Sequence, residues 1–379
     1  MPHPHFPPSE FQERLARLRQ RLADAEVDAA LFDEIEAMTW ISGYGNSENR
    51  WRCVLVPTDA ASAPFFLIRA LDAGPCRRQT WIADVPTFRD WEDPFAILAQ
   101  SLKARGLARA SIGLDYNSYG MPLARFERLR LALPEVTFVD IGPLVWELRL
   151  IKSAAEIALI EQAAGIADAA IVRVARACRN GGTQREAARV AVSTFVELGA
   201  DPGKPGPISA GRGWDFLHAA IEDQTLADGD VVHLELVPSV GGYSARIMRC
   251  VPIGAPSQAL IAAARTLADL QDRQIAAMRP GANASDVDAM LRNGILAAGL
   301  RDSFDNISGY TLGLYAPAGP RTSDFTRTFD PRAQWTLEPG MVFHMYASAA
   351  GVSFSETVLV ESTGPRRLTR LERKLMPSG

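Results

Sequence analysis

The sequence predicts a protein of two domains, an α/β domain followed by an α+β domain with an antiparallel sheet. Its 379 residues exceed the length of one typical domain, and 47% of them are hydrophobic, which is enough for two cores. The pattern of the elements changes near residue 148. Short strands alternate with helices before it, and long helices and blocks of strands follow it. We therefore expect one domain over residues 1–150 and a second over residues 151–379.

The first half of the chain opens with a helical pattern. The sequence Ser-Glu-Phe-Gln at residues 9–12 is typical of a capping box, and apolar residues follow at helical spacing from Phe11 to Leu22. Short apolar segments predict strands at residues 28–32, 53–57, 65–69, 111–115 and 137–141. Helical patterns lie at residues 94–105 and 122–133. This alternation indicates an α/β domain.

The second half contains longer helices and grouped strands. Helical patterns cover residues 153–179, 183–198, 257–278 and 285–300, and the sequence Thr-Gln-Arg-Glu at residues 183–186 predicts a capping box. Strand patterns cover residues 231–237, 243–253, 310–314, 341–346 and 352–360. Helices and strands in separate blocks favour an α+β domain with an antiparallel sheet.

Composition excludes several functional classes. The net charge of −4 leaves no basic stripe for nucleic acid, and no apolar run approaches the roughly 20 residues of a membrane span. The N-terminus lacks the pattern of a secretory signal. The four cysteines are scattered without a CxxC pair, so neither a zinc knuckle nor a disulfide framework is expected. We expect a cytoplasmic protein with reduced cysteines and a small-molecule substrate.

Several short motifs carry a family resemblance through their order along the chain. They are MTWISGY at residues 38–44, RLIKS at 149–153, GDVV at 229–232, GY at 242–243 followed by Arg249, LEPGMV at 337–342 and TVLV at 357–360. Together they resemble the creatinase/prolidase/aminopeptidase P family. The resemblance implies the pita-bread fold, a curved antiparallel sheet backed by helices and preceded by a smaller α/β domain. It also implies a homodimer.

The metal positions of this family are altered in the chain. The family's metallopeptidases hold two divalent ions with two Asp, one His and two Glu. The resemblance places these positions at Glu235, Arg246, Tyr310, Tyr346 and Ser355, or at Glu356 if the alignment shifts by one residue. One or two oxygen ligands cannot hold two divalent cations, and Arg246 carries a permanent positive charge. We therefore expect no metal and no other cofactor, as in the metal-free branch that includes creatinase and ectoine hydrolase.

A charge pair is expected between two of these positions. Side chains alternate along a strand, so His233 and Glu235 share a face. A tight turn between Val240 and Gly241 would then place Arg246 opposite Glu235 on the next strand. Such a pair fits a functional pocket, and it equally fits a structural ion pair with no part in function. The sequence leaves both interpretations open.

Further candidates come from the scarce histidines and a nearby loop. His218 falls on the family histidine that serves creatinase as acid and base, although a lone histidine is more often a hydrogen-bonded core residue. His344 shares a strand face with Tyr346 and should line the same pocket. Arg212 and Trp214 could contact a carboxylate or a ring of the substrate, or simply belong to a solvated loop.

The resemblance suggests metal-independent hydrolysis of a C–N bond in an amidine, a guanidine or a cyclic amide. His218 would activate water or protonate the leaving nitrogen, and Glu235 would orient a cationic substrate or act as nucleophile. The residues expected to bind substrate are Arg212, Arg246, Tyr310, His344, Tyr346 and Glu356. Two alternatives remain: a catalytically inactive homologue that binds a small molecule, and an Xaa-Pro metallopeptidase.

Overall fold

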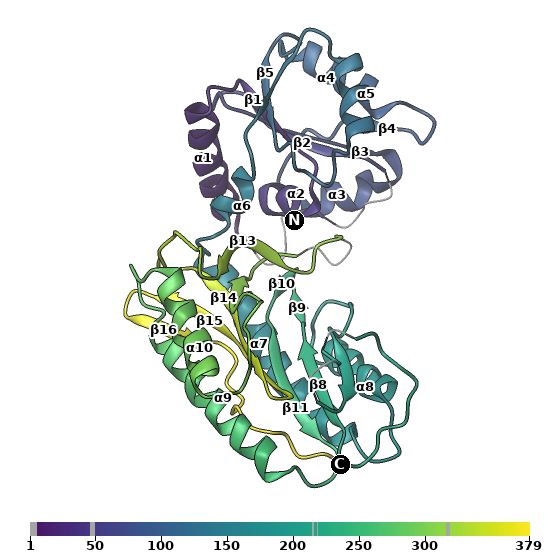
Figure 1. Ribbon diagram of the computed structural model, residues 1–379. Coiled ribbons are helices and arrows are strands. Elements are labelled where there is room, and N and C mark those ends of the chain that lie inside the picture. The colour runs from purple at the N-terminus through teal and green to yellow at the C-terminus, as the bar shows by residue number, and fades with distance from the viewer. Residues whose placement is uncertain (1–5, 46–49, 214–215, 218, 316–318) are drawn as a thin grey trace. The chain divides into compact units, whose positions relative to one another are not determined.

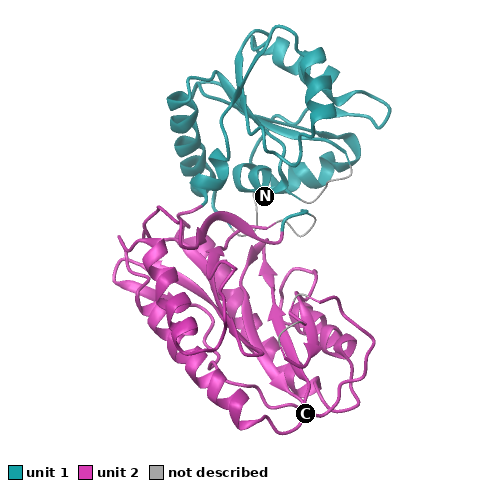
Figure 2. Ribbon diagram, viewed as in Figure 1, with its two compact units in different colours: residues 1–149, 318–321 teal, residues 150–317, 322–379 magenta. Residues whose placement is uncertain are grey.

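The computed structural model describes residues 6–45, 50–213, 216–217, 219–315 and 319–379. The chain divides into two compact units, which Figure 2 shows in different colours. Unit 1 comprises residues 1–149 with residues 318–321, and unit 2 comprises residues 150–317 and 322–379.

Unit 1 is built on a six-stranded mixed sheet with the strand order β4-β3-β2-β1-β5-β6 (Figure 1). Strand β1 is antiparallel to β2 and parallel to β5. The strands are β1 (Ala29–Phe32), β2 (Cys53–Pro57), β3 (Phe65–Arg69), β4 (Thr87–Phe88), β5 (Ser111–Leu114) and β6 (Thr137–Asp140). The helices are α1 (Pro8–Asp24), α2 (Ile35–Ser42), α3 (Ala73–Gln79), α4 (Pro94–Ala104), α5 (Leu123–Ala132) and α6 (Leu144–Leu148), with a 3₁₀ turn at Ala70–Asp72.

The capping box predicted at residues 9–12 is wrong. Helix α1 begins at Pro8, and its N-cap is Pro7, which makes no side-chain cap. Proline at the first helical position has the required φ, and its missing N–H would have no partner there anyway. Ser9 is therefore already inside the helix, because the prolines start the helix before the predicted cap.

Unit 2 is built on an antiparallel sheet with the strand order β13-β12-β14-β15-β11-β8-β7, and β16 also pairs with β15. The strands are β7 (Ile208–Gly211), β8 (Val231–Leu236), β9 (Ser239–Val240), β10 (Tyr243–Ser244), β11 (Ile247–Pro252), β12 (Gly309–Thr311), β13 (Asp324–Phe329), β14 (Val342–Ala349), β15 (Val352–Glu361) and β16 (Gly364–Arg367). The helices are α7 (Ala154–Ala177), α8 (Gln184–Glu197), α9 (Gln258–Ala276) and α10 (Ala284–Ala297).

Local sequence explains the main elements of unit 2. Ser153 and Thr183 each form a complete capping box, at the start of α7 and α8 respectively, and the second confirms a prediction. The hairpin between β14 and β15 turns at Ala350 and Gly351, which have φ values of 49° and 77° as a two-residue hairpin requires. Helix α9 packs on both strands of this hairpin, and α7 packs on β8 to β11 (Figure 1).

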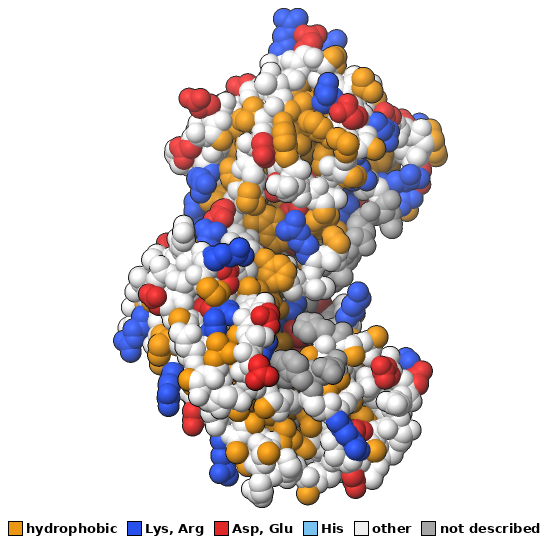
Figure 3. Space-filling view, viewed as in Figure 1, with side chains coloured by type: hydrophobic (Ala, Val, Ile, Leu, Met, Phe, Trp, Pro, Cys, Tyr) orange, Lys and Arg blue, Asp and Glu red, His pale blue; other side chains and the backbone are white. Residues whose placement is uncertain are grey.

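Two features of the described residues bear on function. No described helix is both long and apolar enough to cross a membrane. On the face seen in Figure 3, acidic and basic side chains are interspersed, so no large patch of a single sign forms there.

Candidate functional site

A row of paired residues crosses the sheet of unit 2. Glu235 of β8 pairs with Met248 of β11, and Met248 pairs with Ser355 of β15. Ser355 in turn pairs with Tyr346 of β14. Directly paired residues project from the same face of a sheet. The row therefore places the predicted residues Glu235 and Tyr346 on one face, together with a serine.

His344 joins this face through the alternation of β14. It lies two residues before Tyr346 and pairs with Tyr310 of β12. Its ring centroid is 5.0 Å from that of Tyr310 and 5.3 Å from that of Tyr346, on which it stacks. His344 is fully buried, and neither ring nitrogen has a hydrogen-bond partner among the described residues. An imidazole with unused hydrogen-bonding capacity thus lies within an aromatic cluster.

The electrostatic surroundings keep His344 neutral. Burial lowers the pKa of His344 well below its ordinary value, and the positive charge of Arg246 and the neighbouring His233 lower it further. A neutral imidazole has one donor nitrogen and one acceptor nitrogen. His344 can therefore accept one hydrogen bond and donate another, and it carries no positive charge at neutral pH.

Arg246 and Glu235 form the buried ion pair that the sequence predicts. The Arg246 Nη1 donates to Glu235 Oε1 at 2.9 Å, and the two side chains are 7% and 2% exposed. The same nitrogen donates to the Tyr310 hydroxyl at 2.6 Å. The Nη2 nitrogen donates to the Thr322 carbonyl and to the Ser323 hydroxyl. One guanidinium therefore holds three segments of unit 2 together.

The guanidinium remains a cation in this setting. Burial on its own lowers the pKa of Arg246, but Tyr310 and Glu235 outweigh it, and the pKa lies above its ordinary value. Burial also raises the pKa of Tyr310 to about 12, so its phenol stays protonated. At neutral pH Arg246 is therefore a buried cation beside a neutral Tyr310 phenol.

The strand register behind this pair differs from the prediction. Glu235 pairs with Met248 rather than with Arg246. The predicted strand at residues 243–253 is interrupted: β10 pairs with β9 and bridges to Leu314, and β11 begins at Ile247. Arg246 lies in the interruption, where its N–H and carbonyl bond the Thr357 hydroxyl. The contact with Glu235 is made by the length of the arginine side chain and not by direct strand pairing.

Several buried atoms of this cluster have no protein partner within the described residues. They are Glu235 Oε2, Arg246 Nε, Ser355 Oγ and both nitrogens of His344. Buried polar groups without partners are uncommon, and a ligand or ordered water normally satisfies them. Because several of them face the same side of the sheet, we take this cluster as the candidate site.

The structure does not bring Glu356 to this site, which corrects the prediction for that residue. Glu356 follows Ser355 on β15 and therefore projects from the opposite face. It accepts a hydrogen bond from Arg249 Nη2 at 2.9 Å and another from the Thr369 hydroxyl. Both members of the Arg249–Glu356 pair are fully buried. The shifted alignment is thus wrong, and Ser355 is the residue that faces the cluster.

The remaining candidates fall into three groups: Arg212 lies apart from this cluster, His233 lies beside it, and two residues lie outside the described chain. Arg212 is exposed and donates to Asp230 at 3.1 Å, and the structure does not bring it to Glu235. His233 is buried beside Glu235 on β8 and pairs with Ser209 of β7. His218 and Trp214 lie outside the described residues.

Two residues near the site were missed by sequence reasoning. Ser323 accepts a hydrogen bond from Arg246, and Phe325 places its ring centroid 5.1 Å from that of Tyr310 while remaining 62% exposed. Ser323 immediately precedes β13 and Phe325 is its second residue, and this strand of Thr and Arg lacks a clear apolar alternation. The exposed ring of Phe325 is the kind of signal that only the structure supplies.

The donor set does not fit a pair of divalent cations. The positions carried over from the metallopeptidases hold one carboxylate, a guanidinium, two phenols and a hydroxyl. No group of three or more His, Cys, Asp or Glu side chains that could hold a metal ion occurs in the described part of the chain. A dinuclear centre needs several anionic or imidazole ligands around each ion, and this cluster supplies one carboxylate paired to arginine.

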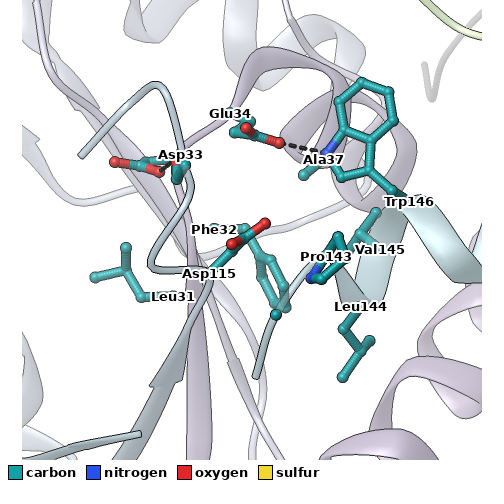
Figure 4. Close-up of a pocket in the computed structure, with 12 residues that line it drawn as sticks. Leu31, Phe32, Asp33, Glu34, Ala37, Asp115, Pro143, Leu144, Val145 and Trp146 are labelled. Atoms are coloured by element: carbon teal, nitrogen blue, oxygen red, sulfur yellow. Dashed lines mark hydrogen bonds between the residues drawn. The ribbon is translucent and has the colours of Figure 1, made fainter. Parts of the chain in front are cut away.

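A small cavity lies within unit 1 (Figure 4). Trp51 and Ser118 donate to Asp33, and Trp146 Nε1 donates to Glu34 at 2.5 Å. Burial raises the pKa of both carboxyl groups. The cavity measures ≈ 20 Å³, about the space of one water molecule. A space of that size does not admit a substrate, so this cavity is not the candidate site.

The fold belongs to the pita-bread class. Its features are a small α/β unit and a separate antiparallel sheet backed by helices, with a polar cluster on one face of the sheet. Residues 14–151 match the creatinase/prolidase N-terminal domain, and residues 158–362 match metallopeptidase family M24. The chain belongs to this family. The family resemblance and the predicted fold class are therefore confirmed.

Relatives and solved structures agree with this assignment. The chain is 24% identical over 400 residues to the ectoine hydrolase of Halomonas elongata, with 98% of each chain covered. It is 29% identical over 241 residues to the Xaa-Pro dipeptidase of Pyrococcus furiosus, covering 63% of this chain and 68% of the relative. The structure of an Xaa-Pro dipeptidase from Bacillus anthracis has a TM-score of 0.83 at 21% identity, covering 97% of this chain and 99% of the other. These named relatives are hydrolases of C–N bonds.

Proposed function

We propose that this protein hydrolyses a C–N bond in a small nitrogenous compound, an amidine, a guanidine or a cyclic amide, without a bound metal ion. The observation that carries the proposal is the Arg246 guanidinium, which is paired with Glu235 at 2.9 Å on the face where the metallopeptidases bind metal. A buried guanidinium at this position neutralises the carboxylate that a metal ion would need as a ligand. The likeness to an ectoine hydrolase over 98% of both chains supports the same class of reaction.

The reaction adds water across the C–N bond. A C–O bond forms at the carbon, the C–N bond breaks, and the leaving nitrogen receives the proton that water gives up. We assign the acid and base role to His218, because a histidine can take and return a proton in one turnover. Glu235 Oε2 accepts an N–H of the substrate, and neutral His344 orients water or the substrate by a hydrogen bond.

A working Xaa-Pro metallopeptidase is the second candidate, because several relatives carry that name. Such a relative polarises its substrate with metal, which requires ligands at positions that here hold Arg246, Tyr310 and Tyr346. The donor set of this chain does not favour that function. A homologue that binds a small molecule without turnover is the third candidate.

The purified protein is expected to contain no stoichiometric divalent metal, and a chelator should leave its stability and turnover unchanged. Elemental analysis, together with assays on ectoine, creatine and alanyl-proline with and without EDTA, tests this. Chelator-resistant turnover of a C–N compound supports the proposal. Alanyl-proline hydrolysis that EDTA abolishes and Mn²⁺ restores would establish the metallopeptidase instead, and tight binding without turnover would establish the binding protein.

Replacing Arg246 with aspartate tests the ligand set from the opposite direction. This variant places a second acid beside Glu235, yet we expect it to bind no pair of divalent ions, because Tyr310, Tyr346 and Ser355 supply no histidine or glutamate ligand. Calorimetric titration with Mn²⁺ and with Zn²⁺ measures the result. Tight binding of two ions per chain would show that the remaining ligands have been placed wrongly.

A further inference from the structure

We infer that the Glu235 cluster selects substrates whose reacting group is an uncharged amide, such as a lactam, and disfavours amidinium and guanidinium ions. The inference rests on the proposed function only in taking this cluster as the substrate site. It narrows the three compound classes of that proposal to one, and it follows from two independent features, the charge balance and the hydrogen-bonding capacity of the cluster.

The charges of the cluster are already balanced, so a cationic substrate would bring a positive charge without a free carboxylate to compensate it. Glu235 is already paired with Arg246 at 2.9 Å, and both side chains are more than nine-tenths buried. Arg301 adds positive charge near Tyr346, whose electrostatic neighbours include Arg301, Tyr310 and Glu235. A cationic substrate would have to be desolvated beside Arg246 while sharing the one carboxylate that Arg246 already uses. The same positive field helps to keep His344 neutral.

The unused hydrogen-bonding atoms point the same way. Glu235 Oε2 is a free acceptor, Arg246 Nε–H is a free donor, and neutral His344 has one of each, within the described residues. Amidinium and guanidinium ions only donate hydrogen bonds, so they leave the arginine donor without a partner. An amide presents a carbonyl acceptor and an N–H donor on adjacent atoms. It can therefore satisfy both kinds of group, and an unpaired buried donor is costly.

Glu235 is less suited to a cation in the structure than the sequence suggests. The sequence suggested that Glu235 orients a cationic substrate, which assumes a carboxylate with its full charge available. In the structure Arg246 occupies one of its two oxygens. The remaining oxygen is suited to a single neutral N–H rather than to the paired donors of a planar cation.

A matched pair of probes tests the inference: 2-piperidone, a neutral lactam, and 2-iminopiperidine, its cationic analogue, which differ at one exocyclic group. Calorimetric or ligand-observed NMR titration of the full chain should give at least about tenfold tighter binding of the lactam, as expected when a buried donor is otherwise left unpaired. Arg246→Met should reverse the order, because Glu235 then lacks its cation. Arg173→Met should retain the wild-type ratio, because Arg173 forms an exposed pair with Glu197 on the surface of α7 and α8.

Tighter binding of 2-iminopiperidine by the wild type would overturn the inference, and so would undetectable binding of 2-piperidone at its highest soluble concentration. If Arg246→Met does not fold, Glu235→Gln serves in its place. It retains an acceptor for Arg246 and removes the carboxylate charge, so the ratio in favour of the lactam should increase. These binding measurements do not depend on turnover. Selective lactam binding by a protein that hydrolyses no compound would remove the proposed reaction and leave the charge selectivity standing.

Discussion

Replacing Arg246 with methionine is expected to lower the free energy of unfolding by roughly 3–5 kcal/mol at neutral pH, the usual cost of breaking a buried ion pair from one side. Arg246 bonds Glu235, Tyr310, Thr322 and Ser323, and methionine supplies none of these donors. The largest part of the loss comes from Glu235, which remains as a buried carboxylate without a cation. Urea denaturation at neutral pH measures the change.

The loss in this variant should depend on pH, and its sign follows from the carboxylate. Below about pH 4, glutamate side chains take up protons in the unfolded chain, so folding no longer has to bury a charge. As the pH rises, the Glu235 carboxyl group loses its proton freely in the unfolded variant. In the folded variant it must either bury a negative charge or keep its proton, and both cost free energy. The difference between wild type and variant is therefore smallest in acid and largest at neutral pH.

Two comparisons make this test specific. Arg173→Met breaks an exposed pair with Glu197 and should change stability by no more than about 1 kcal/mol, as surface pairs do. A loss in Arg246→Met that stays constant between acid and neutral pH would contradict the buried pair. It would mean that Glu235 is solvated or bonded elsewhere in the folded protein.

The sequence predicted elements well where local chemistry decides them. The capping box at Thr183 is confirmed, because both of its hydrogen bonds form within four residues. The strands β8, β14 and β15 were predicted because they are long and apolar. By contrast, β7 and β13 were missed: they are short or polar, and what holds them is pairing with β8 and β12 rather than a local apolar pattern.

The site was predicted less completely than the fold, because the face from which a side chain projects depends on the exact register of its strand. The pair between Arg246 and Glu235 was predicted correctly, although the strand break at residues 245–246 alters how it forms. The position of Glu356 was wrong, because a shift of one residue moves a side chain to the opposite face of a sheet. The sequence could not predict that His344 and Ser355 have buried polar atoms without hydrogen-bond partners. That depends on where every neighbouring side chain lies.

Replacing His344 with phenylalanine is expected to make the protein more resistant to acid relative to the wild type. Burial, Arg246 and His233 hold the pKa of His344 well below the ordinary value of 6.5. Below about pH 6.5 the unfolded chain therefore binds a proton that the folded chain does not, and protons favour unfolding. Stability from the neutral imidazole is fully present above pH 6.5 and declines as the pH falls toward the pKa of the folded state.

The size of this effect follows from linkage. Each pH unit between the two pKa values costs the wild type about 1.4 kcal/mol, and the phenylalanine variant is free of that cost. Urea denaturation at pH 7.5, 6.5, 5.5 and 4.5 gives the stability difference between variant and wild type, in which the titration of other groups cancels.

Tyr346→Phe is the control, because burial raises the pKa of Tyr346 and its phenol does not titrate in this range. The difference for His344→Phe should grow in favour of the variant as the pH falls, whereas the control should run parallel to the wild type. A difference that grows in the opposite direction would mean that a carboxylate holds His344 protonated, and the neutral imidazole assigned to the site would then be wrong.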